Sequence, residues 1–239
     1  MYSTDLAYIH HAGFNEFAHR TAPELIDMLR GHGIRRGLVV DVGCGSGPLA
    51  AHLIEAGYDV LGIDASAAMI RLARSRSSRA KFRRGSLTAT KIPRCAAVVA
   101  LNEVIGYVPD PRGRLSALRK FFARAYKALR PGGLLVFDFM ASAERRTYSA
   151  KSRSGSDWAV AVRASVDRSG RVLTRQITTF RKIGGRYRKM HETHRVHVYS
   201  QVDIQKTLRA IGFRVRMRRS YGHVRLLPGD MAVVAERSG

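Results

Sequence analysis

A run of glycines directly after an apolar segment is the feature that most constrains how this sequence can fold. Residues 38–42 are apolar except for Asp41, and glycines follow at positions 43, 45 and 47 before a helical pattern begins at Pro48. Glycine allows a tight turn and the close approach of a ligand, and it lets the next helix pack near the strand. The segment therefore predicts a strand, a loop and a helix that place bare backbone beside a bound nucleoside.

An acidic residue ends the next apolar segment. Residues 59–63 predict a second strand, and Asp64 follows it directly. A carboxylate at this strand end can accept hydrogen bonds from both hydroxyls of a ribose. Strand, glycine loop, helix, strand and acid in this order are more specific than glycines alone.

Strands and helices alternate along most of the chain. We expect strands at 38–42, 59–63, 81–84, 96–101, 134–139, 213–218 and 231–236, and helices at 48–56, 67–76, 114–129 and 202–211. This alternation predicts an α/β fold with a doubly wound, mostly parallel, seven-stranded Rossmann-like sheet. Residues 1–36 are amphipathic, and Pro23 followed by Glu24 is typical of a helix start.

The pattern of apolar and polar residues changes after residue 140. Residues 141–157 are small and polar and predict a loop, whereas 158–167, 172–182 and 187–199 alternate between apolar and polar and are joined by hairpin turns. We expect an inserted antiparallel β lid. The predicted organisation is a helical cap (1–36), a cofactor-binding core (37–140), the lid (141–200) and a C-terminal completion of the core (201–239).

Composition limits the class of protein. The 239 residues are 45% hydrophobic, enough for the core of one large α/β domain. No apolar run approaches the roughly 20 residues of a membrane span, and the N-terminus lacks the pattern of a signal peptide. The only cysteines, Cys44 and Cys95, lie in or beside apolar strands. They predict buried thiols and a cytoplasmic location.

The charge is strongly positive. The chain carries 34 arginines and 8 lysines, and its net charge is +24. Such a surface attracts acidic partners, but the arginines are scattered and not interleaved with aromatic residues. Three interpretations stay open: a compositional preference for arginine, an acidic or phosphorylated substrate, and nucleic acid.

Three motifs in order resemble the class I S-adenosylmethionine-dependent methyltransferases. Residues 39–47 match the glycine-rich first motif, residues 62–66 the segment with the ribose-binding acid, and residues 129–137 the "L-x-P-G-G" signature before the fifth strand. Dehydrogenases share a glycine loop but usually show G-x-G-x-x-G. The spacing here weighs against a dinucleotide.

The resemblance implies S-adenosyl-L-methionine as the cofactor, with S-adenosyl-L-homocysteine as its product. It assigns the methionine part to the loop, the ribose to the second strand end, the adenine to the third, and the methyl-transfer point to the fourth. The implied cofactor-binding residues are Asp41, Gly43, Cys44, Gly45, Gly47, Asp64, Ala65, Ser86, Leu87, Asn102 and Glu103. Ser86 departs from the family, where an acid is common. Glu103 has an alternative interpretation, a salt bridge to a nearby arginine.

The residues after the fourth strand indicate the class of acceptor. Residues 102–107 contain no Asp-Pro-Pro-Tyr or Asn-Pro-Pro-Tyr, which argues against methylation of DNA adenine or glutamine. The lid favours transfer of a methyl group to an O or N atom of a small-molecule acceptor, anionic acceptors included. We expect the protein to be a monomer or a homodimer. The alternatives are an RNA (tRNA or rRNA) methyltransferase and a non-catalytic nucleic-acid-binding module.

Four residues are candidates to take a proton from the acceptor: His10, Tyr107, Glu192 and His194. On a strand, Glu192 and His194 share a face with two valines, and a polar pair on an apolar face is typical of a buried site. The alternative is that Glu192 pairs with Arg175 or Arg188. His191, His194 and His197 alternate between faces, so we expect no metal site.

Overall fold

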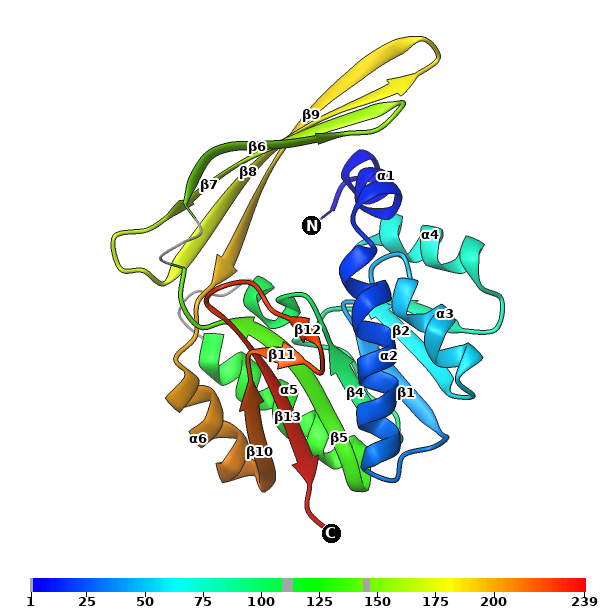
Figure 1. Ribbon diagram of the computed structural model, residues 1–239, viewed down its shortest axis with the longest axis vertical. Coiled ribbons are helices and arrows are strands. Elements are labelled where there is room, and N and C mark those ends of the chain that lie inside the picture. The colour runs from blue at the N-terminus through cyan, green and yellow to red at the C-terminus, as the bar shows by residue number, and fades with distance from the viewer. Residues whose placement is uncertain (1, 109–113, 144–146) are drawn as a thin grey trace.

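The computed structural model describes residues 2–108, 114–143 and 147–239, and its largest element is a seven-stranded sheet (Figure 1). The strand order is β10-β13-β5-β4-β1-β2-β3. The strands are β1 (Leu38–Val42), β2 (Asp59–Asp64), β3 (Lys81–Arg84), β4 (Cys95–Ala100), β5 (Leu129–Met140), β10 (Phe213–Arg218) and β13 (Asp230–Arg237). The pairs among β1 to β5 are parallel, and β13 is antiparallel to both neighbours. The predicted doubly wound, mostly parallel sheet is confirmed.

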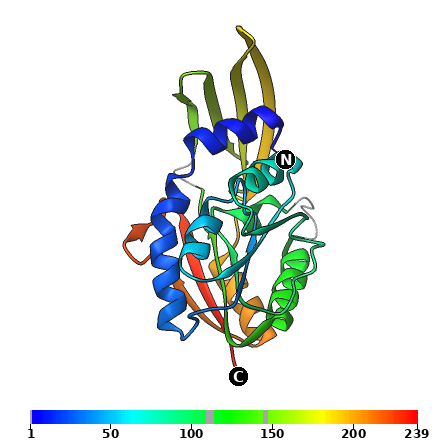
Figure 2. The same cartoon turned by 90° about the vertical axis from the view of Figure 1, so that its right-hand side faces the viewer.

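Helices cover both faces of this sheet, as Figure 2 shows edge-on. The helices α2 (Glu16–Gly31), α3 (Pro48–Glu55) and α4 (Ala67–Arg76) pack apolar side chains against one face. The helices α5 (Arg114–Ala128) and α6 (Gln201–Ile211) pack against the other. Every residue of β4 is buried, as expected for a central parallel strand.

A four-stranded antiparallel sheet forms the lid above the ends of the parallel strands (Figure 1). It consists of β6 (Tyr148–Ser154), β7 (Trp158–Val166), β8 (Val172–Ile183) and β9 (Arg186–His197), inserted between β5 and α6. The first helix, α1 (Thr4–Gly13), packs on it. Leu6 and Ile9 of α1 form an apolar cluster with Trp158, Val160 and Ile177.

Two predicted boundaries are wrong. The segment predicted as a loop, 141–157, contains β6, which pairs with β7. This strand depends on a partner supplied by the neighbouring strand, so its own polar composition does not reveal it. The "L-x-P-G-G" segment also belongs to β5, which begins at Leu129 opposite Cys95, and α5 ends at Ala128.

Pro23 is not a helix start, because it lies inside α2. Proline there removes one backbone hydrogen bond of the helix. The buried face of α2, which includes Leu25 and Leu29, outweighs that loss by packing on the sheet.

Short elements complete the chain at the site. They are the 3-10 helix η1 (Val104–Tyr107) and the two-stranded ribbon of β11 (Ser220–Tyr221) and β12 (Val224–Arg225). Within the described residues, we find no helix with the length and apolarity needed to cross a membrane.

Candidate active site

The glycine loop after β1 is a backbone cradle. Gly43, Gly45 and Gly47 all have positive φ, at 78°, 54° and 76°, a conformation that side chains disfavour. The amides of Gly43 and Cys44 donate to the carbonyl of Ile63 at 2.7 and 3.1 Å, which fixes the loop to β2. A Cβ on Gly45 would meet no atom of the described residues within 4 Å. The loop therefore presents bare backbone to open space, as the sequence predicts.

Asp41, which is buried, and Asp64, which is half-buried, form an acidic pair beside this loop. Asp64 accepts hydrogen bonds from the amides of Gly45, at 3.0 Å, and Ser66, at 2.7 Å. Burial nevertheless raises its pKa. Burial, and then the charge of Asp64, raises the pKa of Asp41 to about 7. A cation placed between the two carboxylates would relieve this repulsion.

The residues predicted to face the adenine lie beside Asp64. The amide of Gly85 donates to the Asp64 carbonyl at 2.9 Å, which places Ser86 and Leu87 after β3 and next to the acid. The Ser86 hydroxyl contacts the Thr88 hydroxyl at 2.9 Å. The carbonyl of Ala65 accepts from Arg84 at 3.2 Å.

Asp138 is a functional candidate that sequence reasoning missed. It is buried near the end of β5, and its carboxylate accepts from the amides of Asn102 (2.8 Å) and Glu103 (2.5 Å) and from the hydroxyl of Tyr221 (3.1 Å). Asn102 and Glu103 have φ of 70° and 61°, which is strained for residues other than glycine. Burial raises the pKa of Asp138 to about 6. A lone carboxylate in the apolar run 134–140 was the available signal.

Glu103 forms the salt bridge that was its alternative interpretation. Arg175, on β8 of the lid, donates to Glu103 Oε2 at 2.8 Å and to the Tyr107 hydroxyl at 3.1 Å. One lid arginine thus bridges to the loop after β4. This contact holds the lid to the core at the predicted methyl-transfer point.

Glu192 and His194 share the covered face of β9, as predicted. His194 Nε2 lies 3.0 Å from Glu192 Oε2, and the amide of Ser3 donates to Glu192 Oε1 at 3.2 Å. Burial pushes the pKa of Glu192 up, but hydrogen bonds from His194 and Ser3 outweigh it and lower the pKa. Arg188 pairs with Asp5 and Arg175 with Glu103, whereas the side-chain partner shown for Glu192 is His194.

Tyr2 is a second residue that the sequence did not reveal. Its ring lies between those of His10 and His194, with centroids 5.3 and 5.1 Å away. Tyr107 contacts His194 from another side at 6.0 Å. Burial, and then the nearby Tyr107, raises the pKa of Tyr2 well above its usual value. His10 and His194 therefore lie against the Tyr2 ring, and Tyr107 and Glu192 lie against His194.

A cavity of about 70 Å³ joins the glycine loop to the elbow between α1 and α2. Its lining includes Asp41, Gly43, Gly45, His10 and Asn15. His10 Nδ1 and Asn15 Oδ1 are buried without a hydrogen-bond partner among the described residues. Burial, and then His11, lowers the pKa of His10 to about 4, so its ring is neutral. Unpaired polar atoms, bare backbone and the Asp41 carboxylate fit the amino-acid end of S-adenosylmethionine.

The three histidines of β9 do not gather around one point. No group of three or more histidine, cysteine or acidic side chains suited to a metal ion occurs within residues 2–108, 114–143 and 147–239. Cys44 and Cys95 are free and buried, and burial raises the pKa of both.

Solved structures with this fold include methyltransferases. A S-adenosylmethionine-dependent methyltransferase from Clostridium acetobutylicum superposes with a TM-score of 0.80 at 16% identity, covering 97% of this chain and 96% of that one. The sugar N-methyltransferase KedS8 from Streptoalloteichus also gives 0.80, at 19% identity, covering 100% of this chain and 94% of that one. These likenesses establish the fold.

Sequence comparison gives the family. Glycine N-methyltransferase of Rattus norvegicus is 34% identical over an alignment of 128 residues that covers 48% of this chain and 43% of that protein. A dTDP-3-amino-3,6-dideoxy-alpha-D-glucopyranose N,N-dimethyltransferase of Streptomyces fradiae is 28% identical over 141 residues, 57% of this chain and 54% of that protein. The chain thus spans about half the length of these relatives. Residues 14–217 match the family described as "Methyltransferase domain", and the chain belongs to that family.

Proposed function

We propose that this protein is an S-adenosylmethionine-dependent methyltransferase that acts on an O or N atom of a small-molecule acceptor. The observation that carries the proposal is the cradle of Gly43, Gly45 and Gly47 beside buried Asp41 and half-buried Asp64. Intact acids and glycines argue against a domain that has lost its cofactor site.

The cofactor supplies a methyl group on a sulfonium that is already a good leaving group. The chain's task is to hold and orient the reactants. Asp64 would hold the ribose, and the loop backbone with Asp41 would hold the methionine part. Asn15 Oδ1 would accept a hydrogen bond from its amino group, and His10 in the tautomer protonated on Nδ1 would donate one to its carboxylate.

The acceptor would lie where Tyr2, Tyr107 and His194 meet. His194 is buried and bonded to Glu192, an arrangement that orients an imidazole to take a proton. Arg175 fixes Tyr107 from the lid side. Closure of the lid by these contacts would keep water from the acceptor.

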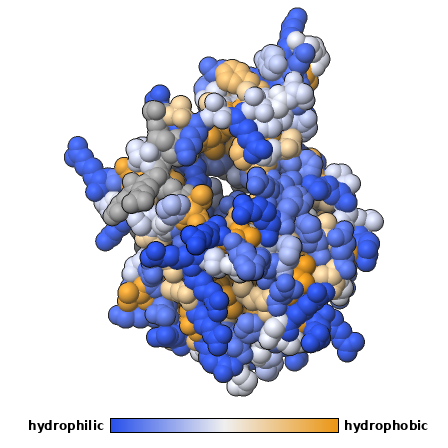
Figure 3. All heavy atoms as spheres, viewed as in Figure 1, coloured by the Kyte–Doolittle hydropathy of each residue, from blue (hydrophilic) through white to orange (hydrophobic). Residues whose placement is uncertain are grey.

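The relatives favour nitrogen as the methylated atom, because two of them are named for N-methylation of glycine and of an amino sugar. An acceptor with an anionic group suits the net charge of +24. Hydrophilic side chains are spread over the face in Figure 3, with hydrophobic ones between them, without forming one continuous stripe. We also infer a cytoplasmic location from the two unpaired cysteines, and a monomer or homodimer.

Transfer of a labelled methyl group tests this function directly. We would supply S-adenosylmethionine with glycine, amino sugars and their nucleoside-diphosphate forms, and with tRNA as the competing acceptor. His194→Asn should lower kcat by about 10²-fold or more, the usual contribution of a general base. His191→Asn is the matched control, since His191 lies on the exposed face of the same strand. Methylation of tRNA alone would overturn the small-molecule assignment.

A further inference from the structure

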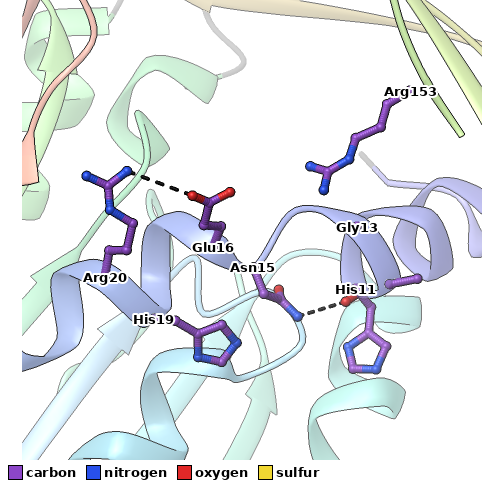
Figure 4. A pocket seen from close by; sticks show the side chains of 8 residues that line it. His11, Gly13, Asn15, Glu16, His19, Arg20 and Arg153 are labelled. Atoms are coloured by element: carbon purple, nitrogen blue, oxygen red, sulfur yellow. Dashed lines mark hydrogen bonds and ion pairs between the residues drawn. The ribbon is translucent and has the colours of Figure 1, made fainter. Parts of the chain in front are cut away.

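An open pocket lies at the elbow between α1 and α2, next to the cavity assigned to the cofactor. Its volume is about 520 Å³, and its polar lining consists of His11, Asn15, Glu16, His19, Arg20 and Arg153. Figure 4 shows Arg153 reaching from the lid toward the elbow, with the helix side chains on the other side. The volume lies within the range of about 300–1,000 Å³ that is usual for small-molecule sites.

The lining of this elbow pocket is cationic. Arg20 and Arg153 supply guanidinium groups, and Glu16 is the one acid that lines it in the described part of the chain. Glu16 lies 3.9 Å from Arg20, and their side chains are 73% and 60% exposed, so this pair is weak. Two guanidinium groups that lack a strong carboxylate partner in the pocket suit phosphate oxygens.

His11 connects the elbow pocket to the glycine loop. Its Nδ1 lies 3.0 Å from the Ser46 hydroxyl and 3.2 Å from Nη1 of Arg76. Because a guanidinium can only donate, Nδ1 is an acceptor there and the ring is neutral with its proton on Nε2. Burial, and then Arg76, lowers the pKa of His11. An anion bound in the pocket would counter Arg76 and favour the charged ring.

The elbow pocket also shares a wall with the cavity over the glycine loop. Asn15 lines both. The guanidinium of Arg153 lies 5.1 Å from the centre of the Phe14 ring, and Phe14 lines the smaller cavity. A molecule held by Arg20 and Arg153 would therefore have its other end within reach of the cofactor side of the elbow.

We propose that the elbow pocket binds the phosphate or diphosphate group of a phosphorylated acceptor. The inference rests on the proposed methyltransferase function and adds that its acceptor carries an anionic phosphate group. The lid and the elbow would hold this group together, so its binding would draw Arg153 of β6 toward α2.

Calorimetry with inorganic pyrophosphate and uridine diphosphate, at constant ionic strength, tests the site. Arg153→Gln and Arg20→Gln should each weaken binding of both probes by about tenfold or more, because charge-assisted hydrogen bonds are lost. Arg209→Gln is the matched control: it removes the same charge from an exposed position on α6 and should leave both affinities within about twofold. The His11 ring protons should shift toward the charged form when pyrophosphate is added.

Several results would overturn the proposal. Equal affinity in all variants would indicate general attraction to a basic surface. Weaker binding of uridine diphosphate than of pyrophosphate would indicate a site for free anions instead of an acceptor. S-adenosylhomocysteine affinity should stay unchanged in Arg153→Gln and Arg20→Gln, and a parallel fall would assign the pocket to the cofactor. If S-adenosylhomocysteine fails to bind even the wild type while the pyrophosphate pattern holds, the methyltransferase function fails and the anion site stands.

Discussion

The two walls of the active site are built in different ways. The cofactor wall is backbone held by near neighbours in sequence, such as Gly45 and Asp64, which are 19 residues apart. The lid wall is made of side chains from distant segments: Asp5 and Arg188 are 183 residues apart, and Glu103 and Arg175 are 72 apart. Local sequence therefore determines the first wall, whereas the second forms only when α1, the lid and η1 come together. The second wall is therefore the one that can open.

The largest expected effect is on the acids of the cofactor wall. The pKa of Asp41 is raised to about 7, so the folded state holds a proton that the unfolded chain releases near pH 4. This stabilisation is complete below about pH 4 and is lost as pH rises through about 7. Asp41→Asn should therefore raise the free energy of unfolding at pH 8 by about 2–4 kcal/mol, while weakening S-adenosylhomocysteine binding.

Urea titrations at pH 5 and pH 8 check this prediction. The difference between variant and wild type should be clearly smaller at pH 5 than at pH 8, because most of the loss develops between these two values. A variant that is less stable than the wild type at both values would contradict the raised pKa of Asp41.

A smaller effect tests whether the cradle is a ligand surface. Gly45→Ala puts a methyl group where the ligand backbone would approach, and Gly57→Ala is the matched control. Both glycines have positive φ (54° and 92°) and open space around them, so both variants should lose about 1–2 kcal/mol of stability. Calorimetry should show that only Gly45→Ala loses S-adenosylhomocysteine affinity, by about tenfold or more, since a loss near 1.4 kcal/mol is tenfold. Equal affinities would show that the loop does not contact the ligand.

The smallest effect concerns the ion pairs of Asp5 with Arg181 and Arg188, a latch that joins α1 to the lid. Arg188 binds both carboxylate oxygens of buried Asp5, at 2.6 and 2.5 Å, and Arg181 binds one at 3.3 Å. Hydrogen bonding from Arg188 is the largest cause that lowers the pKa of Asp5. The latch therefore stabilises the fold above about pH 4 and weakens as pH falls through the lowered pKa.

Asp5→Asn should cost about 1 kcal/mol at pH 7, a value discounted because Arg188 is half exposed. Hydrogen exchange of α1 and β9 amides should become faster, and S-adenosylhomocysteine should associate faster. Asp27→Asn, at an exposed position on α2, is the control. Unchanged exchange in α1 would show that Asp5 does not hold the lid.

The backbone geometry of the cofactor wall could be predicted from the sequence for a physical reason. Glycine spacing, strand ends and Asp64 are local signals, and the parallel strand order brings Asp41, Asp64 and Asn102 to one edge of the sheet. The lid histidine was also readable, because period-two alternation placed Glu192 and His194 on one face.

The missed features depend on contacts between distant residues. Tyr2 acquires its place only when α1 packs on the lid, and β6 forms only beside β7. Arg175 is one of 34 arginines, so its sequence position alone does not show that it reaches Glu103. Asp138 was an exception, since an acid in an apolar strand is visible in the sequence and predicts a buried hydrogen-bonding role.

Calorimetric titration with S-adenosylhomocysteine tests the central claim, that the glycine loop and Asp64 together bind the adenosyl cofactor. Asp64→Ala is compared with Asp59→Ala, which removes an exposed carboxylate at the opposite end of β2. We expect saturable binding by the wild type and by Asp59→Ala, and a loss of about 1–3 kcal/mol of binding free energy in Asp64→Ala, the cost of unpaired buried hydroxyls. No heat with the wild type, or wild-type affinity in Asp64→Ala, would contradict it.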